Sequence, residues 1–231
     1  IEAFAKIQQV VPETLLVLAI DDNAGSVASE LRALIKARGV ESHTVAVGSV
    51  NAELPSLYAV SDVYCSPSVM EGFGMSVQEA AATRVPVVAS ALIPFATEYL
   101  LGDDEDDVEE VSTQSGNTLQ KGAGAIVVEP DDIEGFAQAI GLLLTNDTER
   151  QRMGDQAFNI TIPAFTWGHV VDRFLRQLQD EPLHLRRSAL THLLEADDLG
   201  RITTGELEDL VRADERLTKF RPDGKHQVDP R

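Results

Sequence analysis

Cysteine and basic residues are scarce in this chain, and each shortage argues against a class of protein. The single cysteine, Cys65, cannot form an internal disulfide, so the sequence fits a reducing compartment such as the cytoplasm. Lys and Arg number 19 against 38 Asp and Glu, and the net charge of −19 argues against nucleic acid or an anionic membrane as a partner. The histidines are scattered without the spacing of metal ligands, so we expect no metal site.

Long hydrophobic runs are also missing. No apolar stretch approaches the roughly 20 residues that a membrane-spanning helix needs, so we expect no transmembrane segment. The 231 residues are 43% hydrophobic, which fits a globular protein with one good core and an appendage. The chain begins at Ile1 rather than Met, and we expect it to be a fragment of a longer protein.

Short apolar runs alternate with helical patterns through residues 1–180. This alternation predicts an α/β fold, with a Rossmann-like parallel sheet and helices on both of its faces. Leu15–Ile20 is continuously apolar, as expected for a strand that is covered on both faces. The remaining strands are expected at four further places: residues 43–48, 63–70, 85–89 and 125–129.

Two residues mark the ends of predicted helices. Gly39 follows the apolar positions of a helical pattern and is expected to stop that helix, because glycine readily adopts the left-handed conformation. Asp132 lies in Pro130-Asp-Asp132, which is expected to start another helix. Both residues therefore support helices between the predicted strands.

Two segments depart from the α/β pattern. Residues 102–121 include Asp103 to Glu110, with seven acidic residues in eight positions. We interpret this segment as a solvated, mobile insertion. The less favoured alternative is a divalent-cation site, because the glycine-spaced ligands of a calcium loop are absent. Residues 181–231 predict a helical extension with a disordered end, so we divide the chain into domains at 1–180 and 181–231.

A glycine-containing loop with two carboxylates lies between a predicted strand and a predicted helix. Glu71 and Glu79 stand eight positions apart, and Gly72 and Gly74 between them would let the backbone approach a ligand closely. The N–H groups from Gly74 to Ser76 would favour a phosphate at the helix start. Carboxylates suit sugar hydroxyls, so the pattern indicates a nucleotide sugar. The spacing alone leaves a solvated surface loop as an equal alternative.

The same segment resembles a family signature. Residues 66–80, SPSVMEGFGMSVQEA, and residues 86–90, PVVAS, resemble the retaining GT-B glycosyltransferases of the group 1, sucrose-phosphate-synthase-like family. The E-x7-E motif of that family is matched by Glu71 and Glu79, and the similarity extends to about Leu178. The resemblance implies the carboxy-terminal, donor-binding domain of such an enzyme. It assigns the hexose hydroxyls and a catalytic role to Glu71, and the ribose hydroxyls to Glu79.

The resemblance also implies where the rest of the donor binds. Phe73, Gly74 and Met75 would meet the sugar and diphosphate through their backbone, and Ser76 would complete the donor-binding loop. The nucleotide-diphosphate sugar is a substrate in this family, so no separate cofactor is expected. The acceptor would bind through an amino-terminal domain that we expect to be missing. The Arg and Lys that neutralise the phosphates in the family have no counterpart here, so the chain alone should bind donor weakly and transfer nothing.

Other functions remain open on the sequence. A nucleotide-sugar 2-epimerase or a glycogen-synthase-like enzyme shares the fold and parts of the motif. A non-catalytic interaction module that has kept the GT-B fold is the alternative from a different class. The base, the hexose and the acceptor are not specified by these residues.

Overall fold

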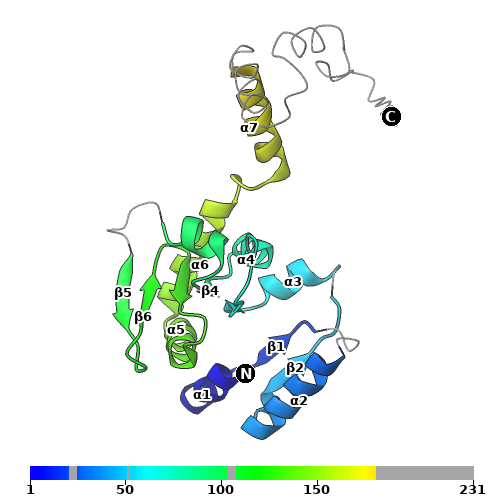
Figure 1. Ribbon diagram of the computed structural model, residues 1–231, viewed down its shortest axis with the longest axis vertical. Helices are drawn as coiled ribbons and strands as arrows, with labels where there is room; N and C mark the ends of the chain where they lie inside the picture. The colour runs from blue at the N-terminus through cyan, green and yellow to red at the C-terminus, as the bar shows by residue number, and fades with distance from the viewer. Residues whose placement is uncertain (21–24, 51, 103–107, 181–231) are drawn as a thin grey trace, which may run out of the picture. The chain divides into compact units, whose positions relative to one another are not determined.

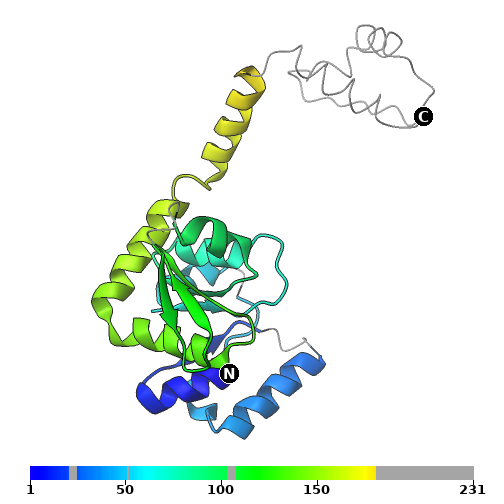
Figure 2. The same cartoon turned by 60° about the vertical axis from the view of Figure 1, so that its left-hand side comes forward.

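The computed structural model describes residues 1–20, 25–50, 52–102 and 108–180, with the side chains of all but the last four of these. The chain divides into two compact units, with the boundary between His169 and Val170. Figures 1 and 2 show the elements from two directions. In chain order they are α1 (Glu2–Val10), β1 (Leu16–Leu18), α2 (Ser26–Arg38), η1 (Glu41–His43), β2 (Thr44–Ala46), α3 (Leu54–Ala59), β3 (Tyr64–Ser66), α4 (Met75–Ala81), β4 (Val87–Ser90), η2 (Ala96–Leu100), β5 (Glu109–Ser112), β6 (Thr118–Lys121), β7 (Ala125–Val128), α5 (Ile133–Thr145), α6 (Asp147–Thr161) and α7 (Trp167–Asp180).

The strands that the structure describes form two sheets. The larger one has the order β3-β4-β7-β6-β5, in which β3, β4 and β7 are parallel and the β5–β6 hairpin is antiparallel. The smaller one is the parallel pair of β1 and β2. Parallel strands connected by helices confirm the predicted α/β class.

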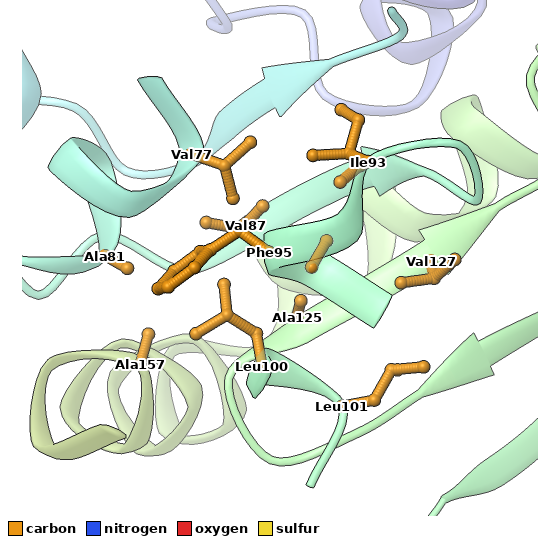
Figure 3. Packing of buried hydrophobic residues seen from close by; sticks show 12 residues of the cluster. Val77, Ala81, Val87, Ile93, Phe95, Leu100, Leu101, Ala125, Val127 and Ala157 are labelled. Atoms are coloured by element: carbon orange, nitrogen blue, oxygen red, sulfur yellow. The ribbon is translucent and has the colours of Figure 1, made fainter. Parts of the chain in front are cut away.

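The two central strands of the larger sheet are buried on both faces. Every residue of β4 and β7 is buried. Val87 and Ala125 point with Val127 into a cluster that includes side chains of α4, η2 and α6, as Figure 3 shows. Val88 and Ile126 point to the opposite cluster, which is lined by α5. Successive strand residues alternate between faces, so helices on both sides leave no part of these strands in water.

Helix α5 covers one face of the larger sheet and begins where the sequence predicts. The Asp132 carboxylate is its N-cap and accepts a hydrogen bond from the Gly135 N–H, at 2.9 Å. Helix α1 packs on α5, and Lys6 of α1 lies 2.6 Å from Glu134 of α5. The predicted stop at Gly39 is likewise confirmed, because Gly39 ends α2 in the left-handed conformation with φ 69°.

The smaller sheet is only partly covered, and here the expectation for Leu15–Ile20 is wrong. Strand β1 is shorter than predicted, and Val17 at its centre is 36% exposed. Val45 at the centre of β2 is 42% exposed. Both edges of this sheet are unpaired within the part of the chain that the structure describes, and strands without neighbours keep more of their surface in water.

The acidic insertion is more ordered than the sequence predicts. Residues 103–107 lie outside the described residues, but β5 and β6 pair antiparallel and extend the larger sheet. Leu119 is buried in the core on the side of α5, and the buried Thr113 hydroxyl donates to Asp132 at 3.2 Å. The prediction of a mobile, solvated segment is therefore wrong for residues 109–121, because local charge does not reveal that an apolar position here finds a core.

The predicted extension at residues 181–231 lies outside the described residues, so the domain division at residue 180 stays a prediction. Helix α7 precedes it and exposes Val171, Phe174 and Leu175. Among the described residues, no helix has both the length and the apolar character that crossing a membrane requires.

Candidate active site

The predicted donor-binding loop follows β3 and leads into α4, so it lies at the carboxyl end of a parallel strand. The neighbouring strand β4 ends at Ser90, and the chain then passes through Ile93 to Phe95 at the same edge of the sheet. The Phe95 N–H donates to the Phe73 carbonyl oxygen at 2.8 Å, which joins the two loops directly. The structure thus builds a two-loop surface where open α/β sheets bind their ligands.

Gly74 holds this surface in shape. It precedes α4 with φ 98°, a backbone conformation that favours glycine. A Cβ atom at this position would lie 2.5 Å from Cγ2 of Ile93 and 3.5 Å from Cβ of Phe95. Gly74 is therefore required both by its backbone angle and by the close approach of the second loop.

The ring of Phe73 is an anchor rather than an exposed group. Its centroid lies 5.4 Å from that of Phe95, 6.1 Å from that of Tyr99 and 6.3 Å from that of Phe165. The side chain is half-buried. Its ring faces the aromatic cluster because burial of a large apolar surface outweighs contact with water.

The remaining predicted residues of the loop and helix leave polar groups accessible. Glu71 and Glu79 are both exposed, and so is Met75 at 64%, whereas Ser76 is half-buried. Glu79 lies on α4, and Glu71 lies in the loop before it. Both carboxylates can thus meet solvent or a ligand, which is what binding of sugar hydroxyls requires. Since α4 has only seven residues, phosphate binding at its start stays a prediction.

Two tyrosines that the sequence reading missed lie behind α4. The hydroxyl of Tyr58, on α3, donates to Oε2 of Glu79 at 3.3 Å. Its ring packs edge-to-face against Tyr64 of β3, with centroids 5.4 Å apart. Burial is the main cause that raises the pKa of Tyr58, and the neighbouring Tyr64 and Glu79 raise it further. No sequence pattern links Tyr58 to Glu79, because 21 positions separate them.

Comparison with known proteins identifies the family. A sequence model described as "Glycosyl transferases group 1" matches residues 1–160, which is more than half of the chain. The chain belongs to the group 1 glycosyltransferases. This membership confirms the resemblance carried by Glu71 and Glu79 and their surroundings.

Curated glycosyltransferases are similar over parts of the chain. An MMP alpha-(1->4)-mannosyltransferase of Mycolicibacterium hassiacum is 30% identical over 123 residues, which is 53% of this chain and 25% of the relative. A GDP-mannose-dependent alpha-(1-6)-phosphatidylinositol monomannoside mannosyltransferase of Mycolicibacterium smegmatis is 25% identical over 175 residues, which is 72% of this chain and 40% of the relative. The matched part spans between 20% and 40% of the length of the curated relatives.

Solved glycosyltransferase-like structures share the fold. Anabaena HepE, in complex with UDP and glucose, superposes with a TM-score of 0.61 at 20% identity and covers 78% of this chain and 44% of that one. Sucrose-phosphate synthase of Thermosynechococcus elongatus gives a TM-score of 0.57 at 21% identity, over 77% of this chain and 41% of that one. These likenesses show that the group 1 chain has the α/β fold of part of a GT-B glycosyltransferase.

Proposed function

We propose that this chain is the donor-binding domain of a retaining glycosyltransferase, which transfers a hexose from a nucleotide-diphosphate sugar to an acceptor hydroxyl. One observation carries the proposal above all others. The loop that holds Glu71 lies at the carboxyl end of β3, and it is bonded to the loop after β4 through Phe73 and Phe95. Ligands of open α/β sheets bind in this place.

Each carboxylate has its own part in the proposed site. Glu71 accepts hydrogen bonds from hexose hydroxyls beside the reacting carbon and is the proposed catalytic residue. Glu79 accepts them from the ribose hydroxyls of the nucleotide. The exposure of both side chains supports these roles, since a carboxylate turned into the core could not reach a ligand. The backbone at Phe73, Gly74 and Met75, with Ser76, meets the sugar and diphosphate.

The proposed reaction needs no redox step and no separate cofactor. The acceptor hydroxyl attacks the anomeric carbon, the bond from that carbon to the diphosphate oxygen breaks, and the nucleoside diphosphate leaves with the bond electrons. The hydroxyl proton passes to an oxygen of the departing diphosphate as the new glycosidic bond forms, so atoms and charge balance. Catalysis then depends on holding the hexose and stabilising the leaving diphosphate more strongly in the transition state than in the ground state.

The named relatives support the chemistry and suggest donors for the test. Two of them are mannosyltransferases, one described as GDP-mannose-dependent, and the HepE structure contains UDP and glucose. The relatives are longer than the part that this chain matches. We expect the acceptor to bind in the part of the enzyme that lies outside this match. We also propose the cytoplasm as the location, on the basis of the single cysteine.

Ligand-observed NMR with UDP-glucose, GDP-mannose and ADP-glucose tests the donor site. We expect one donor to bind weakly to the wild type. The binding signal of that donor should fall at least about tenfold in Glu71→Gln and in Glu79→Gln, because each substitution removes a charged hydrogen-bond acceptor. The matched control is Glu13→Gln, in the exposed turn before the amino end of β1, which should bind like the wild type.

Each contrary outcome has a distinct meaning. If a donor binds equally well to the wild type and to both site variants, the roles of Glu71 and Glu79 are wrong. If none of the three donors binds the wild type, the interaction-module alternative is favoured over the transferase. Release of a free, epimerised sugar by the intact enzyme would favour the 2-epimerase, and extension of a glucan would favour the glycogen-synthase-like enzyme.

A further inference from the structure

Glu79 makes a contact that the family motif does not explain. Its Oε2 atom accepts a hydrogen bond from the Tyr58 hydroxyl at 3.3 Å, and no side chain among the described residues donates to Oε1. The carboxylate itself is exposed, whereas Tyr58 is 7% exposed. One oxygen of Glu79 is therefore tied to the protein interior, and the other remains available.

Burial makes Tyr58 a good anchor. A buried phenol needs a hydrogen-bond partner, and losing that partner costs its desolvation, so the hydroxyl has a strong reason to stay on Glu79. The high pKa of Tyr58, which is due first to burial, keeps the hydroxyl protonated and donating through the neutral range. The edge-to-face contact with Tyr64, at 5.4 Å, fixes the plane of the ring.

The second tyrosine supports the first. Tyr64 is half-buried on β3, and its ring meets that of Tyr58 edge-to-face. Helix α3 and strand β3, which carry the two tyrosines, both pack against α4, so the Tyr58 hydroxyl reaches Glu79 from elements that contact its helix. The two tyrosines come from α3 and β3, which both precede the donor-binding loop in the chain.

We propose that Tyr58 is a positioning residue, which orients the Glu79 carboxylate so that its free oxygen meets the ribose hydroxyls of the donor. The proposal rests on the proposed function, because the ligand of Glu79 is the one assigned there. Tyr58 acts through Glu79 and makes no contact with the donor itself. The tyrosine pair therefore determines how rigidly the site presents this carboxylate before a nucleotide binds.

The contact can be measured without any ligand. The chain has three tyrosines, so protein labelled with 13C at the phenol carbon that bears the oxygen gives three signals. We expect Glu79→Gln to shift the Tyr58 signal, because the charged acceptor is lost, and to leave the Tyr99 signal in place. An unchanged Tyr58 signal in Glu79→Gln would overturn the proposal, and this arm does not depend on the folding of any Tyr58 variant.

The positioning role is measured by donor affinity in a double-mutant cycle, with the three donors named above as probes. Tyr58→Phe should weaken binding about fivefold, and the double variant with Glu79→Gln should bind no more weakly than Glu79→Gln alone. Tyr99→Phe removes the same hydroxyl from a ring that packs among Phe73, Phe95 and Phe165. It should bind within about twofold of the wild type.

The outcomes separate this proposal from the function on which it rests. If the effects of Tyr58→Phe and Glu79→Gln multiply, the two residues act independently and the positioning role is wrong, although the donor site stands. If the wild-type protein binds none of the three donors, both proposals fail together. If Glu79→Gln shifts the Tyr58 signal, and the double variant binds donor no more weakly than Glu79→Gln alone, both the positioning role and the proposed function are supported.

Discussion

The two sheets are built from similar residues and differ in what covers them. In the larger sheet every residue of β4 and β7 is buried. In the smaller sheet the central residues of β1 and β2, Val17 and Val45, remain 36% and 42% exposed. In each sheet these two strands pair in parallel, and each of the four strands contains valine. Residue type favours strand formation in both sheets. The helices and strands that lie against a strand determine how much of it is buried, and therefore how much stability it contributes.

The candidate site is built on the larger, well-covered sheet. Its two loops follow β3 and β4, and Val77, Ile93 and Phe95, which hold those loops, are fully buried. A close-packed interior resists compression, so loops that are anchored on this core keep their geometry. The carboxylates are exposed, but the backbone that carries them is rigidly supported.

The largest difference between the two regions is expected at glycine. Gly74→Ala should lower the free energy of unfolding by about 2 to 4 kcal/mol, because it combines a positive φ with overpacking against Ile93. Gly48, after β2, has φ 70° but nothing within 4 Å of an added Cβ, so Gly48→Ala should cost only about 1 kcal/mol. Urea unfolding measures both variants. Equal losses would mean that the second loop can move away from Gly74.

Truncated valines test the same contrast in the strands. Val88→Ala in β4 should cost about 2 kcal/mol, because it leaves a cavity at a position that is fully buried. Val17→Ala in β1 should cost about 0.5 kcal/mol or less, since water already reaches that side chain. The unfolding midpoint in urea at constant slope reports both. A loss at Val17 as large as that at Val88 would show that the smaller sheet is covered in solution.

A buried and an exposed N-cap extend the comparison to helices. Asp132→Ala should cost about 1 to 2 kcal/mol, and Asn146→Ala, at the exposed cap of α6, about 0.5 to 1 kcal/mol. Besides capping α5, Asp132 accepts hydrogen bonds from the Ser115 hydroxyl at 2.7 and 2.8 Å and from the Thr113 hydroxyl. Thermal unfolding of both variants at pH 7 measures the difference.

The contribution of Asp132 should also depend on pH. Burial alone would raise the pKa of Asp132, but the bonds from the Gly135 N–H and the hydroxyls of Ser115 and Thr113 outweigh it and lower the pKa. A lowered pKa stabilises the fold above the pKa of the unfolded chain, and that stability is lost as the pH falls through the folded value. The gap between wild type and Asp132→Ala should be full at pH 6 and shrink below about pH 4. A constant gap would contradict the assignment.

The smallest effects are expected from surface ion pairs, and here the two regions should agree. Arg84 and Asp155 lie 2.6 Å apart beside the larger sheet, and Glu2 pairs with Arg38 of α2 beside the smaller one. Asp155→Asn and Glu2→Gln should each change the free energy of unfolding by less than about 1 kcal/mol, and by less still in 1 M salt. A loss above about 2 kcal/mol at either pair would show that charge, and not only burial, separates the regions.

Local patterns predicted the elements well where their causes are local. The left-handed stop at Gly39 and the helix start at Asp132 depend on a few neighbouring residues, and both are confirmed. The coverage of Leu15–Ile20 was predicted wrongly, because a continuous apolar run says nothing about which segments lie against it. The hairpin at residues 109–121 was not predicted for a related reason. The seven acidic residues between Asp103 and Glu110 indicate a solvated segment, and the sequence does not show that Leu119, further along, is buried in the core.

The site divides in the same way. Glu71, Gly74 and Glu79 are predicted as site residues from their spacing and from the family signature, and the structure places their loop after the parallel strand β3. The ring contacts of Phe73 and the hydrogen bond from Tyr58 were not predicted, since both join parts of the chain that are distant in sequence.

The sequence by itself determined the alternation of strands and helices outside the hairpin at residues 109–121, the α/β class and the group 1 membership, because these follow from periodicity, helix ends and a motif read along the chain. Only the tertiary structure decided which strands are covered. It alone also decided that a hydrogen bond joins the loops after β3 and β4, and that the Tyr58 hydroxyl donates a hydrogen bond to Glu79. The physical reason is that burial and hydrogen bonding depend on distance in space, which the spacing of residues along a chain does not contain.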